Sequence, residues 1–250
     1  MQRIKDLIKG KSVAIVGNAE SIYNTYNKID SHDVVIRSNY GYPRAGTYRH
    51  TGRRTDIVLF CYKFSTNTDM NIYKKFNPQY VVSLDHLADN KGIDNYVIYP
   101  DEYINDIRNK VFKSAKDPHA STGLNSLDMC MRLGGYKDIT LYGFDFFQTK
   151  DWSTGGNGKR KSVVHDFNIE QLYIMDIIRY NENINIKGVD SMGVPKKKAN
   201  KAVLSAVKEK VIKEAVVKKT TTLTKCECGH AQEVNPNVRT SCWNCGRRIA

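Results

Sequence analysis

The chain has 250 residues, of which 40% are hydrophobic and 26% charged, and it carries a formal net charge of +13. The hydrophobic fraction is enough for a real core, and the length suits one α/β domain plus a small module. No apolar run approaches the roughly 20 residues that a membrane-spanning helix needs, so we expect neither a transmembrane segment nor a membrane partner.

The first nine residues, MQRIKDLIK, interrupt every apolar pair with a charge. This pattern predicts a short amphipathic helix rather than a signal peptide, and we expect a cytoplasmic protein. Two apolar runs follow, at residues 13–16 and 34–36, and between them lie a turn at Gly17-Asn18 and an amphipathic segment at about residues 19–28. The order strand, turn, helix, strand predicts one parallel βαβ unit.

Polar residues follow both of these predicted strands directly. The carboxyl ends of parallel strands are where open α/β sheets bind ligands. Gly17 would let a ligand approach the backbone, and the amides of Asn18 and Asn39 offer hydrogen-bond donors and acceptors. Arg37 could supply a phosphate contact, or it could simply be solvated. The alternative for Gly17 and Asn18 is that they are only turn residues.

The rest of the first 190 residues alternates apolar and amphipathic segments. Strands are predicted at residues 56–60, 80–84, 96–99, 139–142 and 185–189, and helices at residues 101–114, 121–133 and 166–180. Such alternation predicts an α/β fold, a Rossmann-like parallel sheet with helices on both faces. Cys130 falls in a predicted helix and Cys61 adjoins a predicted strand, so we expect two buried thiols.

Two helix starts carry candidate functional groups. Ser121-Thr122-Gly123 opens the helix at residues 121–133, where backbone N–H groups and hydroxyls could hold a phosphate or a ribose. His165 precedes the next helix, and an imidazole suits a general base because its pKa lies near neutrality. The alternative is that His165 merely caps that helix. No Asp-x-Asp stands at a strand end, so we expect no catalytic metal.

Three segments between about residues 12 and 170 resemble, in order, the long, short and very short motifs of the sialyltransferase family of inverting glycosyltransferases. The long motif is carried by VGNAESI, IDSHDVVIRSNYG and HTGRRTDIVLF. The short motif is carried by HASTGL and DITLYGFD, and the very short motif by HDFNIE, a histidine with a glutamate five residues on. Residues 151–156, DWSTGG, lack the histidine that the family often carries before the last motif.

The resemblance implies roles for several of these residues. It implies that His165 is the catalytic base, that Glu170 supports it, and that catalysis needs no metal. It also implies a nucleotide-sugar donor, cytidine-linked in the family, with Asn18 and Asn39 in contact with the nucleotide. The full candidate donor site comprises Gly17, Asn18, Asn39, Ser121, Thr122 and Gly123.

The positive charge is concentrated in one segment. Residues 191–225 carry ten lysines against two glutamates, net +8, whereas residues 1–190 carry net +4 and residues 226–250 net +1. Within this basic linker, apolar residues recur with helical spacing over residues 199–219, which predicts an amphipathic helix. It could pack on the catalytic domain, pair with a second chain in an oligomer, or face a nucleic acid.

Two cysteine pairs mark the last 25 residues as a small metal module. Cys226 and Cys228 form one pair, and Cys242 and Cys245 form the other. Two close pairs across a short span predict a tetrahedral zinc ribbon whose zinc is structural, with His230 as the alternative for one cysteine. A disulfide is disfavoured because no secretion signal is recognised.

These observations predict three regions: a glycosyltransferase domain at residues 1–190, a basic linker at 191–225 and a zinc ribbon at 226–250. The basic linker and the ribbon favour transfer of a sugar to nucleic acid, such as a hydroxymethylated base in viral DNA. A composition rich in Asn, Lys and Tyr would fit a phage or an AT-rich bacterium. One alternative is a sialyltransferase acting on a glycan, and another is a nucleic-acid-binding protein with an inactive transferase-like domain.

Overall fold

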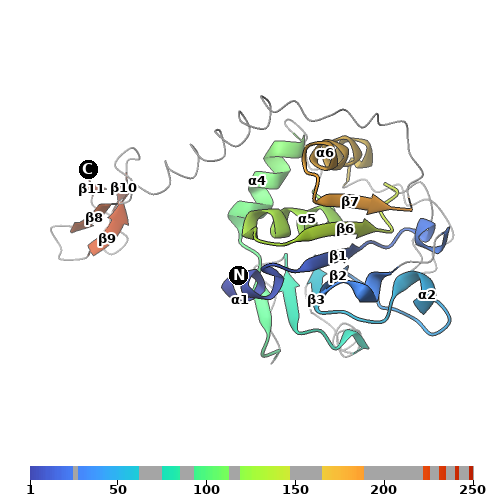
Figure 1. The fold of residues 1–250 in the computed structure, drawn as a ribbon. Coiled ribbons are helices and arrows are strands. Elements are labelled where there is room, and N and C mark those ends of the chain that lie inside the picture. Colours follow the sequence, from blue (N-terminus) through green and yellow to red (C-terminus); the bar gives the residue numbers. More distant parts are fainter. Residues whose placement is uncertain are drawn as a thin grey trace. The chain divides into compact units, whose positions relative to one another are not determined.

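A computed structural model describes the placement of most of the chain. The described residues are 1–24, 28–61, 75–84, 93–112, 119–146, 165–188, 222–225, 231–234, 240–241 and 248–249. They belong to two compact units, Met1–Lys196 and Lys197–Ala250. The first unit is an α/β domain (Figure 1). None of the described helices is both long and apolar enough to cross a membrane.

Seven parallel strands form one sheet in the order β5-β4-β3-β2-β1-β6-β7 (Figure 1). They are β1 (Ser12–Val16), β2 (Val34–Ser38), β3 (Ile57–Phe60), β4 (Tyr80–Ser83), β5 (Tyr96–Ile98), β6 (Asp138–Tyr142) and β7 (Ile184–Lys187). The chain runs outwards from β1 to β5 on one side and resumes at β6 on the other. The predicted parallel α/β fold is therefore confirmed, and the strand order reverses beside β1, where such sheets bind ligands.

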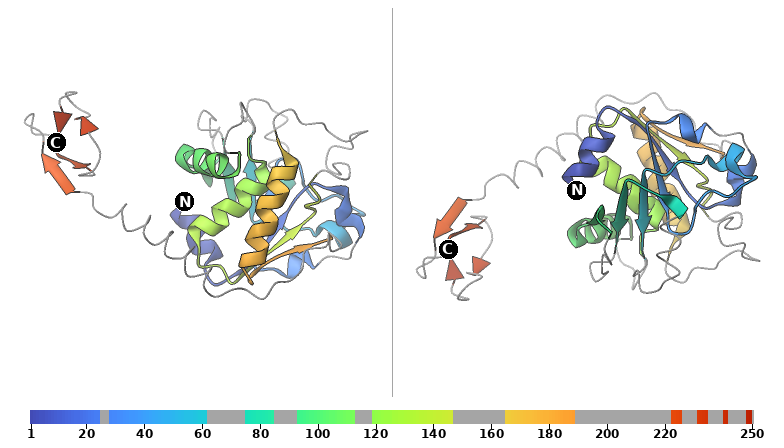
Figure 2. Two further views of the ribbon diagram at one scale, coloured as in Figure 1. Left: turned by 90° about the horizontal axis from the view of Figure 1, so that it is seen from above. Right: turned by 90° about the horizontal axis from the view of Figure 1, so that it is seen from below.

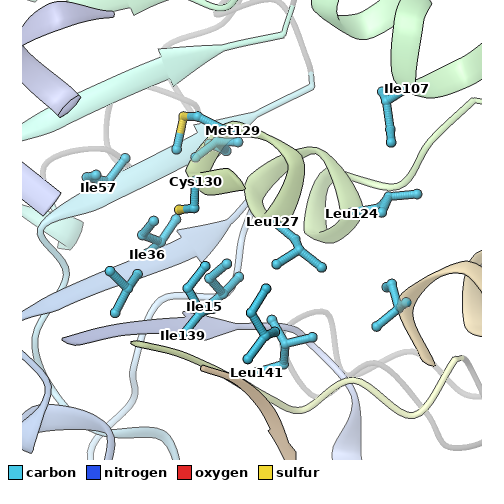
Figure 3. Packing of buried hydrophobic residues seen from close by; sticks show 14 of the residues in the cluster. Ile15, Ile36, Ile57, Ile107, Leu124, Leu127, Met129, Cys130, Ile139 and Leu141 are labelled. Carbon is cyan, nitrogen blue, oxygen red and sulfur yellow. The ribbon is translucent and has the colours of Figure 1, made fainter. Parts of the chain in front are cut away.

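Four helices line one face of the sheet and share one core. They are α1 (Gln2–Ile8), α4 (Asp101–Phe112), α5 (Thr122–Leu133) and α6 (Phe167–Tyr180). Figure 2, left, shows α4, α5 and α6 side by side over the strands. In Figure 3, Leu127 and Cys130 of α5 point towards the strands. The core includes Ile15, Ile36, Ile57, Leu124, Leu127, Cys130, Ile139 and Leu141, all fully buried.

The opposite face carries shorter elements, which correct one prediction. The prediction of an amphipathic helix at residues 19–28 is wrong for the part that the structure describes: Glu20–Asn24 form a 3-10 helix, and another follows the segment at Ile29–Ser31. Tyr, Asn, Thr and Ser dominate this segment, and their helix propensity is low. Ile22 and Ile29 still reach the core of that face, where the short helix α2 (Tyr48–Thr51) also lies near the first turn.

Of the two thiols predicted to be buried, one is buried and the other is exposed. Cys130 lies on α5 with 0% exposure, as predicted. The prediction for Cys61 is wrong: its side chain is exposed because β3 ends at Phe60, one residue earlier. Cys61 therefore stands at the carboxyl edge of the sheet instead of inside it.

Two glycines let the carboxyl ends of β1 and β6 meet. The N–H of Gly17 donates to the carbonyl of Tyr142 at 2.7 Å. A Cβ added to Gly17 would lie 2.5 Å from the carbonyl oxygen of Gly143, which itself has a φ of 66°. The structure thus gives Gly17 a packing role between backbones, in addition to the ligand approach that the sequence suggested.

In the second unit the described residues form two small antiparallel pairs. Strand β8 (Thr222–Lys225) pairs with β9 (Ala231–Val234), and β10 (Thr240–Ser241) pairs with β11 (Arg248–Ile249). The predicted linker helix at residues 199–219 lies outside the described residues, and so do Cys226, Cys228, Cys242, Cys245 and His230.

The glycine contact gives a test of the fold. Gly17→Ala should lower the free energy of unfolding by about 1–3 kcal/mol, because the new methyl group meets a backbone atom that cannot swing away. The matched control is Gly10→Asn, since nothing lies within 4 Å of a Cβ there and asparagine tolerates its φ of 70°. Denaturant unfolding measures both variants. If Gly17→Ala and Gly10→Asn lowered the free energy of unfolding equally, the contact between Gly17 and Gly143 would not be tight.

Candidate active site

The candidate site lies at the carboxyl edge of the sheet, where β1, β2, β3 and β6 end. Helices α5 and α6 present their N-termini there. The structure brings the three predicted motif segments to this edge: Asn39 after β2 contacts Thr122 at the start of α5, and Glu170 on α6 contacts Ser121. Residues far apart in the sequence therefore share one site, as the motif order suggested.

Asn39 joins three elements. It has a φ of 50°, in the left-handed region, and its N–H donates to the carbonyl of Leu59 at 2.8 Å. Its side-chain Nδ2 donates to the Thr122 hydroxyl at 3.0 Å, and its Oδ1 accepts from the Cys61 N–H at 3.2 Å. Sequence reasoning missed Cys61, whose only signal was its position directly after an apolar run.

Asn18 follows β1 and has an unused acceptor. Its Nδ2 donates to the carbonyl of Ser38 at 3.3 Å. Its Oδ1 and the Ser38 hydroxyl are buried and have no hydrogen-bond partner among the residues that the structure describes. A buried polar atom left unpaired costs about 1–3 kcal/mol, so both atoms suit hydrogen bonds to a bound ligand.

The N-terminus of α5 is shaped for an anion. The Ser121 hydroxyl accepts from the Leu124 N–H at 3.2 Å and so caps the helix. The amides of Thr122 and Gly123 remain at the positive end of the helix dipole. A Cβ on Gly123 would lie 2.7 Å from the ring of Phe144, so this position also needs glycine for packing.

His165 has the geometry of a neutral base. Its Nδ1 lies 2.6 Å from the carbonyl oxygen of His119, and because a carbonyl only accepts, Nδ1 carries the proton. The other nitrogen, Nε2, then keeps its lone pair in the neutral ring. Burial lowers the pKa of His165 below 6.5, although its hydrogen bond to His119 acts in the opposite direction. The imidazole is therefore neutral at pH 7 and ready to accept a proton.

Glu170 is a buried carboxyl that holds the start of α5. Only 2% of it is exposed, and its Oε1 accepts from the Ser121 N–H at 2.8 Å. Burial raises the pKa of Glu170 from 4.5 to about 7, against the lowering effect of its hydrogen bonds with Ser121. Two hydrogen bonds thus tie residues 119–121 to the start of α6, one from His165 just before the helix and one to Glu170 in its first turn.

Arg37 does not fit the predicted phosphate contact. It is fully buried, with its Nη2 donating to the Thr51 carbonyl at 2.7 Å and its Nε to the Thr55 hydroxyl at 3.0 Å. Burial lowers the pKa of Arg37 to about 10. Side chains alternate along β2, so Arg37 shares the face of Val35, opposite the face on which α5 packs. Its role is to hold the segment at residues 51–55.

The raised pKa of Glu170 predicts a pH-dependent stability. Because its pKa is higher in the folded than in the unfolded chain, its stabilising contribution is complete below about pH 4.5 and is lost as the pH rises through about 7. Glu170→Gln keeps an oxygen that accepts from Ser121 but does not titrate. Between about pH 5 and about pH 8, wild type should therefore lose more unfolding free energy than Glu170→Gln. Glu182→Gln, at an exposed position, is the control and should behave like wild type.

The chain is similar to known proteins in sequence and in fold. No family model matches the chain. The chain is 28% identical over 224 residues to the type 2 lactosamine alpha-2,3-sialyltransferase of Rattus norvegicus and 26% identical over 220 residues to that of Homo sapiens. Both matches cover 72% of this chain but only 66% of the relative, so the chain spans about two thirds of the length of these curated relatives.

The fold is shared with a solved structure. A crystal structure of a variant of the sialyltransferase CST-II in complex with CMP matches with a TM-score of 0.52 and 16% identity, over 73% of this chain and 83% of that chain. At this level of identity the match concerns the fold alone. In sequence and in fold, the chain is therefore similar to sialyltransferases, which are glycosyltransferases.

Proposed function

We propose that the chain is an inverting, sialyltransferase-like glycosyltransferase that moves a sugar from a CMP-linked donor to a hydroxyl group of a glycan. The observation that carries the proposal is the pair of hydrogen bonds that His165 and Glu170 form with residues 119–121. These two hydrogen bonds hold the neutral imidazole of His165 beside the N-terminus of α5, which is suited to a phosphate. Transferring a sugar from a nucleotide needs both a base for the acceptor and a partner for the leaving phosphate.

The reaction is a single displacement. Nε2 of His165 takes the proton from the acceptor hydroxyl as its oxygen attacks the anomeric carbon of the sugar. The bond between that carbon and the phosphate oxygen breaks, and the nucleotide leaves with the electron pair. The amides of Thr122 and Gly123 stabilise the negative charge on the leaving phosphate. Attack from the face opposite the leaving group inverts the anomeric centre.

The nucleotide side of the proposal rests on the two asparagines. Asn18 offers a buried acceptor and Asn39 an amide at the same edge of the sheet. CMP is the nucleotide in the solved structure with the matching fold, which supports a cytidine-linked donor here. The proposal uses no catalytic metal, and transfer should persist in EDTA without added Mg²⁺.

The comparisons favour a glycan acceptor over the nucleic acid that the sequence suggested. The curated relatives are named for type 2 lactosamine, and none of the comparisons supports DNA as an acceptor. The argument for DNA came from the basic linker and the cysteine module, which lie largely outside the described residues. The proposal favours an active domain over an inactive one, because a neutral imidazole at His165 and the amides at the start of α5 supply the two groups that the transfer needs.

The test is a transfer assay with the full chain. The protein is incubated with CMP-sialic acid and a type 2 lactosamine oligosaccharide, and products are identified by mass spectrometry. A parallel reaction contains DNA with hydroxymethylated bases. Sialylated oligosaccharide is the expected product. Transfer to DNA alone would reverse the choice of acceptor, and no transfer to either, with no hydrolysis of the donor, would refute the proposed enzyme.

The base assignment predicts a catalytic defect. His165→Ala should lower turnover by roughly 10²-fold or more and leave donor binding nearly intact, because a positioned general base contributes on that scale. His119→Ala is the matched control, since it removes the imidazole of the residue bonded to His165 but keeps the backbone carbonyl that His165 contacts. Turnover and CMP affinity are measured for both. Normal turnover in His165→Ala would refute the assignment.

We also propose a structural zinc in the second unit. Cys226 and Cys228 fall in the sequence between the paired strands β8 and β9, and Cys242 and Cys245 fall between β10 and β11. Each cysteine pair thus belongs to the connection of one antiparallel pair. Four thiolates from two such connections match the tetrahedral coordination that zinc prefers.

This zinc proposal predicts one zinc per chain in protein purified without chelators. Replacing Cys242 and Cys245 by serine should abolish bound zinc, because two of the four thiolates are lost. Cys61→Ser, in the first unit, should leave the zinc content unchanged. Elemental analysis of the purified proteins measures the ratio. A zinc content near zero in wild type, or one unchanged by the double substitution, would contradict the site.

A further inference from the structure

We propose that Cys61 is a positioning residue of the donor site. Its backbone N–H and its thiol together fix the side-chain amide of Asn39 so that Asn39 presents an N–H group, and not an oxygen, to the donor nucleotide. The inference rests on the proposed function, which places the nucleotide at this edge of the sheet.

The contacts around Asn39 determine which way its amide points. Its Oδ1 lies 3.2 Å from the backbone nitrogen of Cys61 and 3.3 Å from the Cys61 sulfur. A backbone N–H only donates, so the amide oxygen must face Cys61. The amide nitrogen then faces Thr122 Oγ1 at 3.0 Å. A flipped amide would set two N–H groups against each other at Cys61.

This orientation limits what Asn39 can offer a ligand. Both lone pairs of its oxygen are used by Cys61, and one of the two Nδ2 protons is used by Thr122. Among the residues that the structure describes, this leaves one N–H of Asn39, which requires a hydrogen-bond acceptor on the ligand. A cytidine nucleotide has such acceptors in its base carbonyl, its ribose oxygens and its phosphate.

The backbone of Asn39 is fixed independently of Cys61. Its N–H bonds to Leu59, and its left-handed φ is one that asparagine tolerates better than most residues. The Cys61 side chain is exposed, so removing its sulfur opens no cavity in the core. The thiol is therefore expected to matter for the rotation of the Asn39 amide and hardly at all for folding.

Three variants of the full chain test this role. Cys61→Ala removes the side-chain donor, Cys61→Ser replaces it with a hydroxyl donor, and Cys130→Ala removes a thiol from the core as a control. Cys61→Ala should weaken CMP binding roughly 3- to 10-fold, the effect of one lost hydrogen bond, and Cys61→Ser should restore it. In the transfer assay, Cys61→Ala should raise the donor KM and leave kcat unchanged. Cys130→Ala should lower the melting temperature without this KM change, whereas Cys61→Ala should not lower it.

A second readout does not need the donor. The side-chain amide resonances of Asn39, assigned by NMR in the protein without ligand, should move in Cys61→Ala and return in Cys61→Ser. If wild type binds CMP and Cys61→Ala binds it equally well, or if serine fails to rescue, the inference is wrong while the proposed function stands. If wild type does not bind CMP, the proposed donor is wrong and the role in the donor site falls with it. The resonances then still decide whether Cys61 orients Asn39.

Discussion

The hydrogen bond between the Glu170 carboxyl and the Ser121 amide is the contact on which the site depends. Glu170 lies on the first turn of α6 and Ser121 caps α5, so one buried bond fixes the two helix starts relative to each other. His165, just before α6, contacts the same segment, because its imidazole bonds to the carbonyl of His119. A carboxyl buried to this degree is costly to ionise, which is why burial raises the pKa of Glu170 to about 7. Two hydrogen bonds, one to Glu170 and one from His165, thereby hold the proposed base beside the start of α5.

Much of the fold could be predicted from the sequence because the sheet is parallel and buried. Continuous apolar runs such as Val34 to Ile36 predict strands without knowledge of their neighbours. The segment at residues 19–28 could not be predicted in the same way: its spacing imitates an amphipathic helix, but its described residues Glu20–Asn24, most of which have low helix propensity, form a 3-10 helix. There the tertiary core, filled by Ile22 and Ile29, decided the conformation instead of the local pattern.

In the candidate site, too, some features follow from the local sequence pattern and others depend on tertiary packing. The positions of Asn18, Asn39 and Ser121 after strands or before helices follow from local pattern alone. The contact between Asn39 and Cys61 depends on the register of β2 against β3, which no single segment reveals. The prediction for Arg37 fails most clearly, because a charged residue at a strand end suggests a side chain in contact with solvent or with a ligand. Only the structure shows that residues 51–55 pack over Arg37 and that a carbonyl and a hydroxyl accept hydrogen bonds from its buried guanidinium.

The position of β1 in the sheet has a consequence for how the chain is made. Its residues pair on one side with β2, which follows closely in the sequence, and on the other with β6 at residues 138–142. During synthesis one edge of the apolar strand β1 therefore stays unpaired until β6, and with it more than half of the protein, has left the ribosome. An open edge of this kind invites pairing with other chains. Nascent chains halted before β6 should be the aggregation-prone species and the ones that chaperones must protect.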